Sequence, residues 1–285
     1  MIPFFQQPTL QLGPLTIHAF GAFVALAMMW GTAAAERGFC RDGLDVSVGS
    51  RLGAWTLAGG LIGAHLFSVL FYFPHKVMAD PWLLLRVWED VSSFGGMLGG
   101  LSGVVLFLYV GAGHAAFPRR WDYLGVVARV FPASLAIGRL GCAFAHDHPG
   151  TTTFFPLAIS LRSDAAIRFI RGVYADAGLV ADAGASGQAA PTGFHDLGWY
   201  EFLFLALVIV PLFQLLQRRY RPGRSHLIAF PVLYLPVRFG LDLLRIADVR
   251  YAGLTPAQWV AGLTMLLLSV FAMIRGRGVL RPKLK

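Results

Sequence analysis

The sequence has few charged residues and almost no cysteine. Charged residues make up 14% of the 285 positions, whereas soluble domains are about 25% charged. Only two cysteines are present, Cys40 and Cys142, which excludes a disulfide-rich scaffold and a CxxC zinc module. Acidic residues are scarcer than basic ones, 15 against 24, and the formal net charge is +9.

Apolar residues are abundant instead. The chain is 56% hydrophobic, with a mean hydropathy of +0.62. A soluble protein of this size cannot hide so much apolar surface in one core. Alone, a charge of +9 would suggest a nucleic-acid partner. Together with this hydropathy, the positive charge indicates a polytopic membrane protein whose basic residues lie in cytoplasmic loops. We therefore expect no nucleic-acid partner.

Seven segments are long and apolar enough to approach the length of about 20 residues that a bilayer requires. We therefore predict an all-α integral membrane protein with about seven transmembrane helices, forming a single polytopic domain over residues 1–285. The predicted spans are Leu15–Ala35, Leu52–Tyr72, Phe94–Val110, Tyr123–Phe144, Tyr200–Gln217, Leu227–Arg245 and Pro256–Ile274.

The distribution of Lys and Arg predicts the orientation. With the N-terminus outside, 14 of the 24 basic residues fall in inside loops, seven in outside loops and three within spans. The positive-inside rule therefore favours a periplasmic N-terminus and a cytoplasmic C-terminus. The longest loop, at about 145–199, then lies outside and suggests a membrane-embedded site that faces outward.

The sixth predicted span contains charges, which are costly in a bilayer and mark functional sites. Tyr234, Arg238, Asp242 and Arg245 are spaced 4, 4 and 3 residues apart, so they share one helix face. One interpretation is an Arg238–Asp242 ion pair that only allows the helix to insert into the membrane. The other is a cationic wall that binds an anionic group.

Arg139 interrupts the fourth span near its outer boundary. It could extend toward the headgroups merely to reach water. The glycines on either side, Gly138 and Gly141, also let a ligand approach closely, and a guanidinium can hold a phosphate with two hydrogen bonds. Together, Arg139 and Arg238 suggest a site for a lipid phosphate.

Three histidines follow on the outer side. His146, His148 and His195 have metal-ligand side chains, but a tetrahedral set would need Cys142 to join them. We favour a general base among them over a metal site, because imidazole titrates near neutral pH. His18 and His65 lie in apolar spans and are either hydrogen-bonded core histidines or functional residues.

The third span is rich in glycine. Gly96/Gly100 and Gly99/Gly103 are small-xxx-small pairs, which are typical of close packing between helices. We favour this role over a catalytic one for the glycines.

These residues resemble the prolipoprotein diacylglyceryl transferase family over nearly the whole chain, and the spacing is preserved in the later motifs. The matches are His18 and Gly21 on the family's HxxG, Ser93–Gly96 on SFHGG, Gly138–Gly141 on GRxGN with Gly150 as the closing glycine, His195, Tyr200 and Glu201 on HPSQLYE, Tyr234, Arg238, Asp242 and Arg245 on YxxxRxxxExxR, and Gln258 on a late glutamine.

The resemblance implies a transferase of the bacterial cytoplasmic (inner) membrane, with its site toward the outer face. It would move diacylglyceryl from phosphatidylglycerol to the lipobox cysteine in the signal peptide of a preprolipoprotein, and glycerol phosphate would leave. The reaction requires no metal or organic cofactor. Arg139 and Arg238 would be catalytic and hold the phosphate; the other lipid-binding positions would be Tyr234, Gly95, Gly96 and Gly150, supported by His18, His195, Glu201, Asp242 and Arg245.

Three positions depart from the family's pattern. The family's histidine before the paired glycines is Gly95, its asparagine after GRxG is Cys142, and a first-span tyrosine is Phe20. We expect His146 or His148 to replace the missing histidine as base. The alternatives are a catalytically altered paralogue that binds anionic phospholipid, and a small transporter with a polar path through the fourth and sixth spans, although no repeat symmetry supports the latter.

Overall fold

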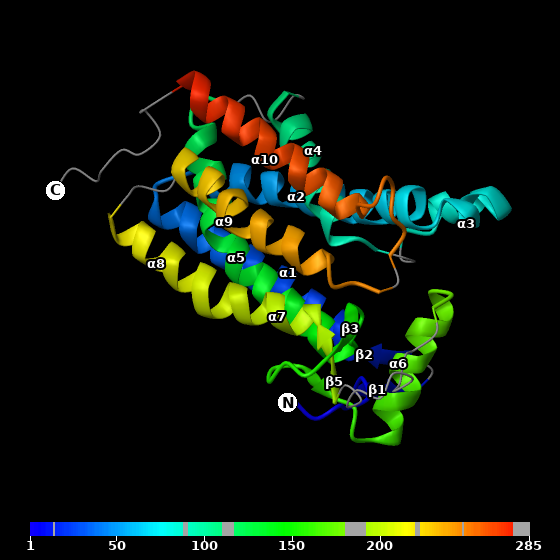
Figure 1. The fold of residues 1–285 in the computed structure, drawn as a ribbon. Helices are drawn as coiled ribbons and strands as arrows, with labels where there is room; N and C mark the ends of the chain where they lie inside the picture. Colours follow the sequence, from blue (N-terminus) through cyan, green and yellow to red (C-terminus); the bar gives the residue numbers. More distant parts are fainter. Residues whose placement is uncertain are drawn as a thin grey trace. The chain divides into compact units, whose positions relative to one another are not determined.

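The computed structural model describes residues 1–13, 15–87, 91–109, 117–179, 192–219, 223–246 and 248–275, and these are mostly helical (Figure 1). π-helical turns lie at Ser68–Tyr72 and Leu205–Ile209, and each continues the helix before it. The helices are α1 (Ala19–Arg41), α2 (Val46–Phe67), α3 (Pro74–Ala79), α4 (Ser93–Tyr109), α5 (Arg120–Ala145), α6 (Asp164–Asp176), α7 (Leu197–Phe204), α8 (Val210–Arg219), α9 (Arg224–Asp242) and α10 (Pro256–Arg275).

Five helical segments within the described residues are long and apolar enough to cross a membrane: Ala19–Arg41, Val46–Tyr72, Arg120–Ala145, Leu197–Arg219 and Pro256–Met273. This agrees with an all-α membrane protein. The third predicted span corresponds to α4, which is apolar but shorter. The sixth corresponds to α9, which carries Arg238 and Asp242. The number of seven spans and the positions of the termini stay predictions.

The first predicted span begins too early. Leu15–His18 is strand β2, which pairs antiparallel with β1 (Thr9–Leu12), and α1 begins only at Ala19. Gly13 has a φ of +61° between the two strands, a conformation that glycine adopts without strain. Thr16 and Ile17 are β-branched and favour the strand.

The described chain divides into two compact units. One consists of Met1–Gly31, Phe131–Leu215 and Leu233–Asp248. In this unit the beginning of α1 packs on the end of α5: the Ser134 hydroxyl donates a hydrogen bond of 2.7 Å to the Ala27 carbonyl. A Cβ on Gly141 would lie 3.1 Å from the Phe20 carbonyl oxygen. Small residues therefore let these two helices approach closely.

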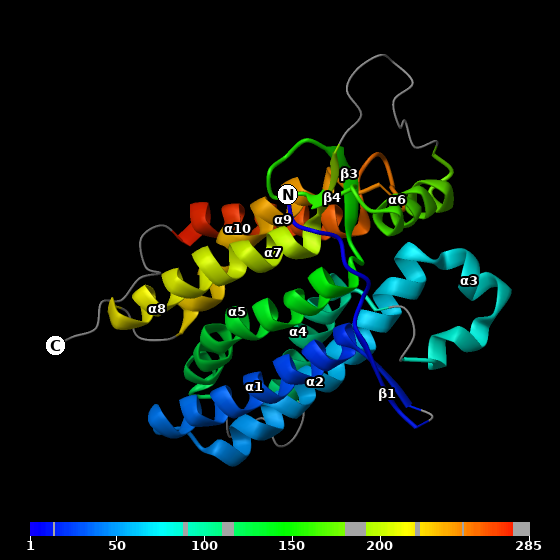
Figure 2. The same cartoon turned by 90° about the horizontal axis from the view of Figure 1, so that it is seen from below.

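The same unit contains a folded region where the sequence predicted an outer loop. The sheet has the order β3-β5-β4, from Pro149–Thr153, Gly193–Asp196 and Ile159–Ser160. Helix α6 packs on this sheet, since Ile170 forms a buried cluster with Ile159 and Phe194 (Figures 1 and 2). These contacts fix the chain immediately after α5 and immediately before α7.

The other unit, Thr32–Val130, Leu216–Val232 and Val249–Lys285, is organised around α2 and α4. Their glycines face each other: a Cβ on Gly99 would lie 2.2 Å from the Gly59 carbonyl oxygen. A Cβ on Gly95 would lie 2.4 Å from the Gly63 carbonyl oxygen. The glycines thus serve close helix packing, as the sequence indicated, and no side chain fits at position 95 on this backbone.

We expect Gly99→Ala to destabilise the protein by about 1–3 kcal/mol, because the added methyl overpacks the α2–α4 contact. Gly100→Ala is the matched control, since its Cβ would meet the Thr56 carbonyl oxygen at an ordinary 3.5 Å. The measurement is the unfolding midpoint in detergent. Equal midpoints for the two variants would contradict the packing assignment.

Candidate functional site

Within the first unit, residues of three helices place charged side chains together. Helix α5 carries Arg139, α7 carries Glu201, and α9 carries Tyr234, Arg238 and Asp242. The side chains of these five residues are at most 3% exposed. The site therefore brings together the charged residues of the fourth and sixth predicted spans, Arg139 from one and Arg238 and Asp242 from the other.

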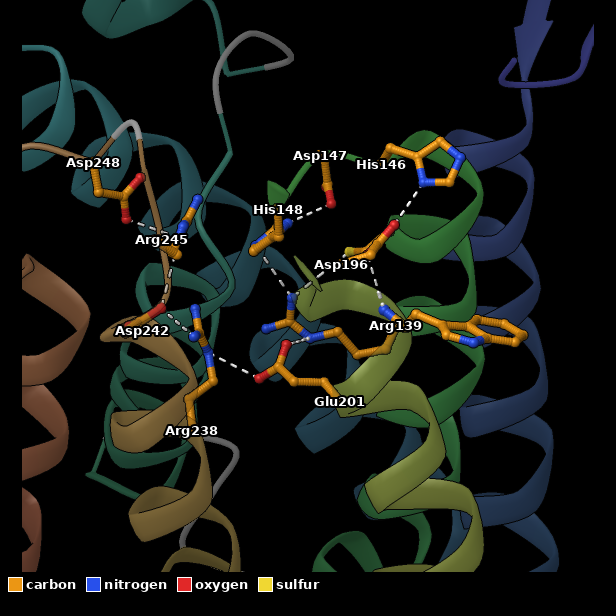
Figure 3. Close-up of polar contacts among 12 residues, drawn as sticks. Arg139, His146, Asp147, His148, Asp196, Glu201, Arg238, Asp242, Arg245 and Asp248 are labelled. Atoms are coloured by element: carbon orange, nitrogen blue, oxygen red, sulfur yellow. Dashed lines mark hydrogen bonds and ion pairs between the residues drawn. The ribbon is translucent and has the colours of Figure 1, made fainter. Parts of the chain in front are cut away.

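Glu201 joins the two arginines. Its Oε2 lies 2.9 Å from Arg139 Nε, and its Oε1 lies 2.8 Å from Arg238 Nε (Figure 3). The hydroxyl of Tyr234 also donates to Oε1, at 2.8 Å. Removal of one member of such a buried ion pair leaves an uncompensated charge, so the three side chains form a single unit.

The N-terminus of α7 sets the position of Glu201. The Asp196 carboxylate accepts a hydrogen bond of 3.1 Å from the Trp199 backbone N–H and caps the helix. An N-cap carboxylate satisfies a backbone N–H group at the helix start. Glu201 then lies one turn inside α7, on the side that faces α5 and α9 (Figure 3).

The charge network continues along α9 and beyond its end. Arg238 Nη1 donates to Asp242 Oδ1, so the ion pair considered from the sequence is present. Arg245 Nη1 lies 3.9 Å from Asp242 Oδ1 and 2.9 Å from Asp248 Oδ2. Burial raises the pKa of Asp248, although the guanidinium of Arg245 opposes this.

The charges of this network balance, yet Nη2 of Arg139 is left without an acceptor among the described residues. Arg139, Arg238 and Arg245 face Glu201, Asp242 and Asp248, three positive charges against three negative ones. Within the described part of the chain, the buried Nη2 of Arg139 has no hydrogen-bond partner. A buried donor without an acceptor costs about 1–3 kcal/mol, and an anion at Arg139 would relieve that cost.

His148 lies against this arginine. Its Nε2 is 3.4 Å from Arg139 Nη1, and its Nδ1 contacts Asp147 Oδ1 (Figure 3). A guanidinium only donates hydrogen bonds, so Nε2 is the acceptor and the ring proton lies on Nδ1, toward Asp147. The carboxylate of Asp147 thus orients the imidazole with Nε2 toward Arg139, an arrangement suited to accepting a proton.

His146 points elsewhere. Its Nδ1 is 2.5 Å from Asp196 Oδ2, its Nε2 is 3.1 Å from the Phe5 carbonyl oxygen, and its ring stacks on Phe4. Both nitrogens are therefore engaged within the fold. The geometry favours His148 over His146 as the base, a choice that the sequence left open.

The remaining predicted residues have structural contacts. His195 Nδ1 is 2.9 Å from the Tyr200 hydroxyl, and burial lowers the pKa of His195. A Cβ on Gly150 would lie 2.9 Å from the Leu244 carbonyl oxygen, so this glycine permits close packing. His18 is exposed on β2, whereas His65 is buried and 2.9 Å from the Leu83 carbonyl oxygen.

The roles predicted for Gly95 and Gly96 in lipid binding stay predictions. Their positions in α4 face α2: a Cβ on Gly96 would lie 3.6 Å from the Ala64 Cβ. Asp147 and Asp196 orient His148 and His146, and neither was predicted as a site residue. The position of Asp147 between the two histidines was the available signal; Asp196 offered none.

Known proteins place the chain in a family. The family model of prolipoprotein diacylglyceryl transferase matches residues 7–275. The phosphatidylglycerol–prolipoprotein diacylglyceryl transferase of Chromohalobacter salexigens is 26% identical over 87% of this chain and 82% of its own length. The enzymes of the same name from Azotobacter vinelandii and Coxiella burnetii are each 27% identical, over 93% and 92% of this chain and 89% and 92% of their own lengths.

We expect Glu201→Gln to destabilise the protein by about 3–5 kcal/mol, because it leaves Arg139 and Arg238 buried without their shared carboxylate. Tyr234→Phe, which removes a hydrogen bond to the same oxygen and keeps the charged groups, should cost about 1 kcal/mol. Unfolding in detergent measures both. A Glu201→Gln protein as stable as the Tyr234→Phe protein would rule out the bridging role.

Proposed function

Because the chain belongs to the prolipoprotein diacylglyceryl transferase family, we propose that it transfers diacylglyceryl from phosphatidylglycerol to the lipobox cysteine of preprolipoproteins. The thiolate sulfur attacks the glyceryl carbon, a thioether forms, and the bond from that carbon to the phosphate oxygen breaks. The thiol proton passes to a base, and glycerol phosphate leaves with the electron pair. Both substrates reach the site from the outer side of the bacterial inner membrane.

The single observation that carries this proposal is the buried guanidinium of Arg139, whose Nη2 has no hydrogen-bond partner among the residues that the structure describes. Arg139 Nε is held by Glu201, and Nη1 makes long contacts of 3.7 Å to Cys142 Sγ and 3.4 Å to His148 Nε2. A phosphate that takes the edge formed by both Nη1 and Nη2 forms two hydrogen bonds and replaces those long contacts. Arg238, on the other side of Glu201, supplies a second positive charge. A phospholipid headgroup provides the anion that this edge lacks.

The same arginines favour the chemical step. Negative charge increases on the phosphate as the carbon–oxygen bond breaks, and fixed cations stabilise that charge without reorganising. Glu201 holds both guanidinium groups in position before substrate binds. Tyr234 is fixed by the same carboxylate and stands beside the phosphate site as a positioning residue.

His148 acts as the base in this proposal. Its contacts with Arg139 Nη1 and with Asp147 hold the ring in one orientation, with Nε2 toward the arginine. Binding of the phosphate to the Nη1–Nη2 edge draws Nη1 away from the imidazole, which leaves the Nε2 lone pair for the lipobox thiol. The thiolate is the nucleophilic form of cysteine.

We expect Arg139→Gln to lower kcat/KM at least ten-fold, since a charged hydrogen bond contributes about 1.5–3 kcal/mol. Arg129→Gln is the matched control: Arg129 lies on the same helix, but its Nη1 pairs with Asp42 at 3.3 Å. The assay uses purified protein, phosphatidylglycerol and a lipobox peptide, with the product read by mass spectrometry. Unchanged turnover of Arg139→Gln would exclude the phosphate role.

We expect His148→Ala to lower kcat by about 100-fold or more, because general-base catalysis contributes about 10²–10⁴-fold. His146→Ala should lower the unfolding midpoint while changing turnover per folded molecule far less. Both variants are assayed at equal amounts of folded protein. A larger loss of turnover in His146→Ala than in His148→Ala would reverse the assignment.

One observation favours a second candidate, the catalytically altered paralogue. The position of the family's histidine is Gly95, and its backbone leaves no space for a side chain. Such a paralogue would bind phosphatidylglycerol through Arg139 without transferring it. Rescue of a strain depleted of its own transferase separates the two functions: growth supports the transferase, and binding without rescue supports the paralogue.

A further inference from the structure

Three side chains of different metal-ligand types converge beside the proposed phosphate site. Cys142, Asp147 and His148 each offer one ligand atom, and these atoms all lie within 4.8 Å of one another. The thiol of Cys142 is buried, Asp147 is exposed and His148 is partly buried. Thiolate, carboxylate and imidazole are the three side-chain ligands that zinc prefers.

The backbone brings the three together. Helix α5 ends at Ala145, and His146 follows with a φ of +49°, a conformation that is uncommon outside glycine. This residue reverses the chain, so Asp147 and His148 return toward the last turn of the helix. Cys142 lies on that turn. His146 is itself held by Asp196 and Phe5, so the reversal is fixed by the fold.

We propose that Cys142, Asp147 and His148 bind one thiophilic divalent cation of the zinc class. Ligand atoms around tetrahedral zinc are roughly 3.5 Å apart, as follows from bond lengths of about 2.0–2.3 Å. Because the three ligand atoms lie within 4.8 Å of one another, small side-chain rotations bring them to this spacing. A solvent molecule takes the fourth position.

The local charges permit a dication. A thiolate and a carboxylate neutralise the two positive charges of the ion, and the neighbouring Arg139 is already compensated by Glu201, 2.9 Å away. Arg139 Nη1 also donates toward Cys142 Sγ at 3.7 Å. Hydrogen bonds to ligand atoms from outside the coordination sphere orient metal ligands, so this arginine supports the thiolate form.

His146 and His148 thus have different roles. His146 is fixed by Asp196 and takes no part, whereas His148 belongs to the cluster. A bound ion and the thiol proton of the proposed reaction compete for the imidazole of His148, so the two roles alternate. The metal site does not depend on the proposed transfer, since spectra rather than turnover detect it.

The test is titration of the full-length, tag-free protein in detergent with Co²⁺, which reports thiolate ligation by a charge-transfer band in the near ultraviolet. We expect one equivalent to saturate the band. Cys142→Ser should abolish it, while Cys40→Ser, which alters the only other cysteine, should keep it.

A second variant tests the site independently, in case Cys142→Ser fails to fold. Asp147→Asn changes an exposed side chain and should weaken Co²⁺ binding about ten-fold or more while the unfolding midpoint is unchanged. Zn²⁺ should displace Co²⁺ and remove the band. A missing band, a band that survives Cys142→Ser, or a band lost in Cys40→Ser would overturn the proposal.

Discussion

The site depends on one carboxylate, that of Glu201, between two buried guanidinium groups. Arg139 and Arg238 come from different helices, and like charges repel strongly where water is excluded. Glu201 lies 2.9 Å and 2.8 Å from their Nε atoms and makes the arrangement stable. Because Asp196, at the end of strand β5, caps the helix that carries Glu201, the fold of the β3-β5-β4 sheet also determines where the arginines meet.

This arrangement explains how a cationic site persists without ligand. Each arginine is held through Nε by the bridging carboxylate, and Arg238 is held again by Asp242. Among the described residues, Nη2 of Arg139 has no hydrogen-bond partner, so an arriving phosphate adds a hydrogen bond there without breaking the bridge. Preorganised cations of this kind stabilise charge that develops on a leaving group, which is what the proposed transfer requires.

The sequence predicted where most helices lie and that Arg139 and Arg238 are candidate site residues, but it did not predict which side chains they contact. Apolar segments located the helices because burial in lipid demands length and hydropathy, and the 4-residue spacing anticipated the Arg238–Asp242 contact. The Arg139–Glu201 ion pair joins residues that are far apart in the sequence, and local sequence patterns cannot predict such a contact. The separation of His146 from His148 depends on a reversal at His146 with a φ of +49°, which no residue type there indicates.

The departures from the family's pattern fall at positions with clear physical consequences. Gly95 is packed closely against α2, and Cys142 lies beside Arg139.

The central claim is that Arg139 holds the lipid phosphate. A structure with phosphatidylglycerol bound tests it most directly: the account predicts a phosphate oxygen about 2.7–2.9 Å from Arg139 Nη2, with Glu201 still between the arginines. A phosphate bound elsewhere, with Nη2 unengaged, would contradict it.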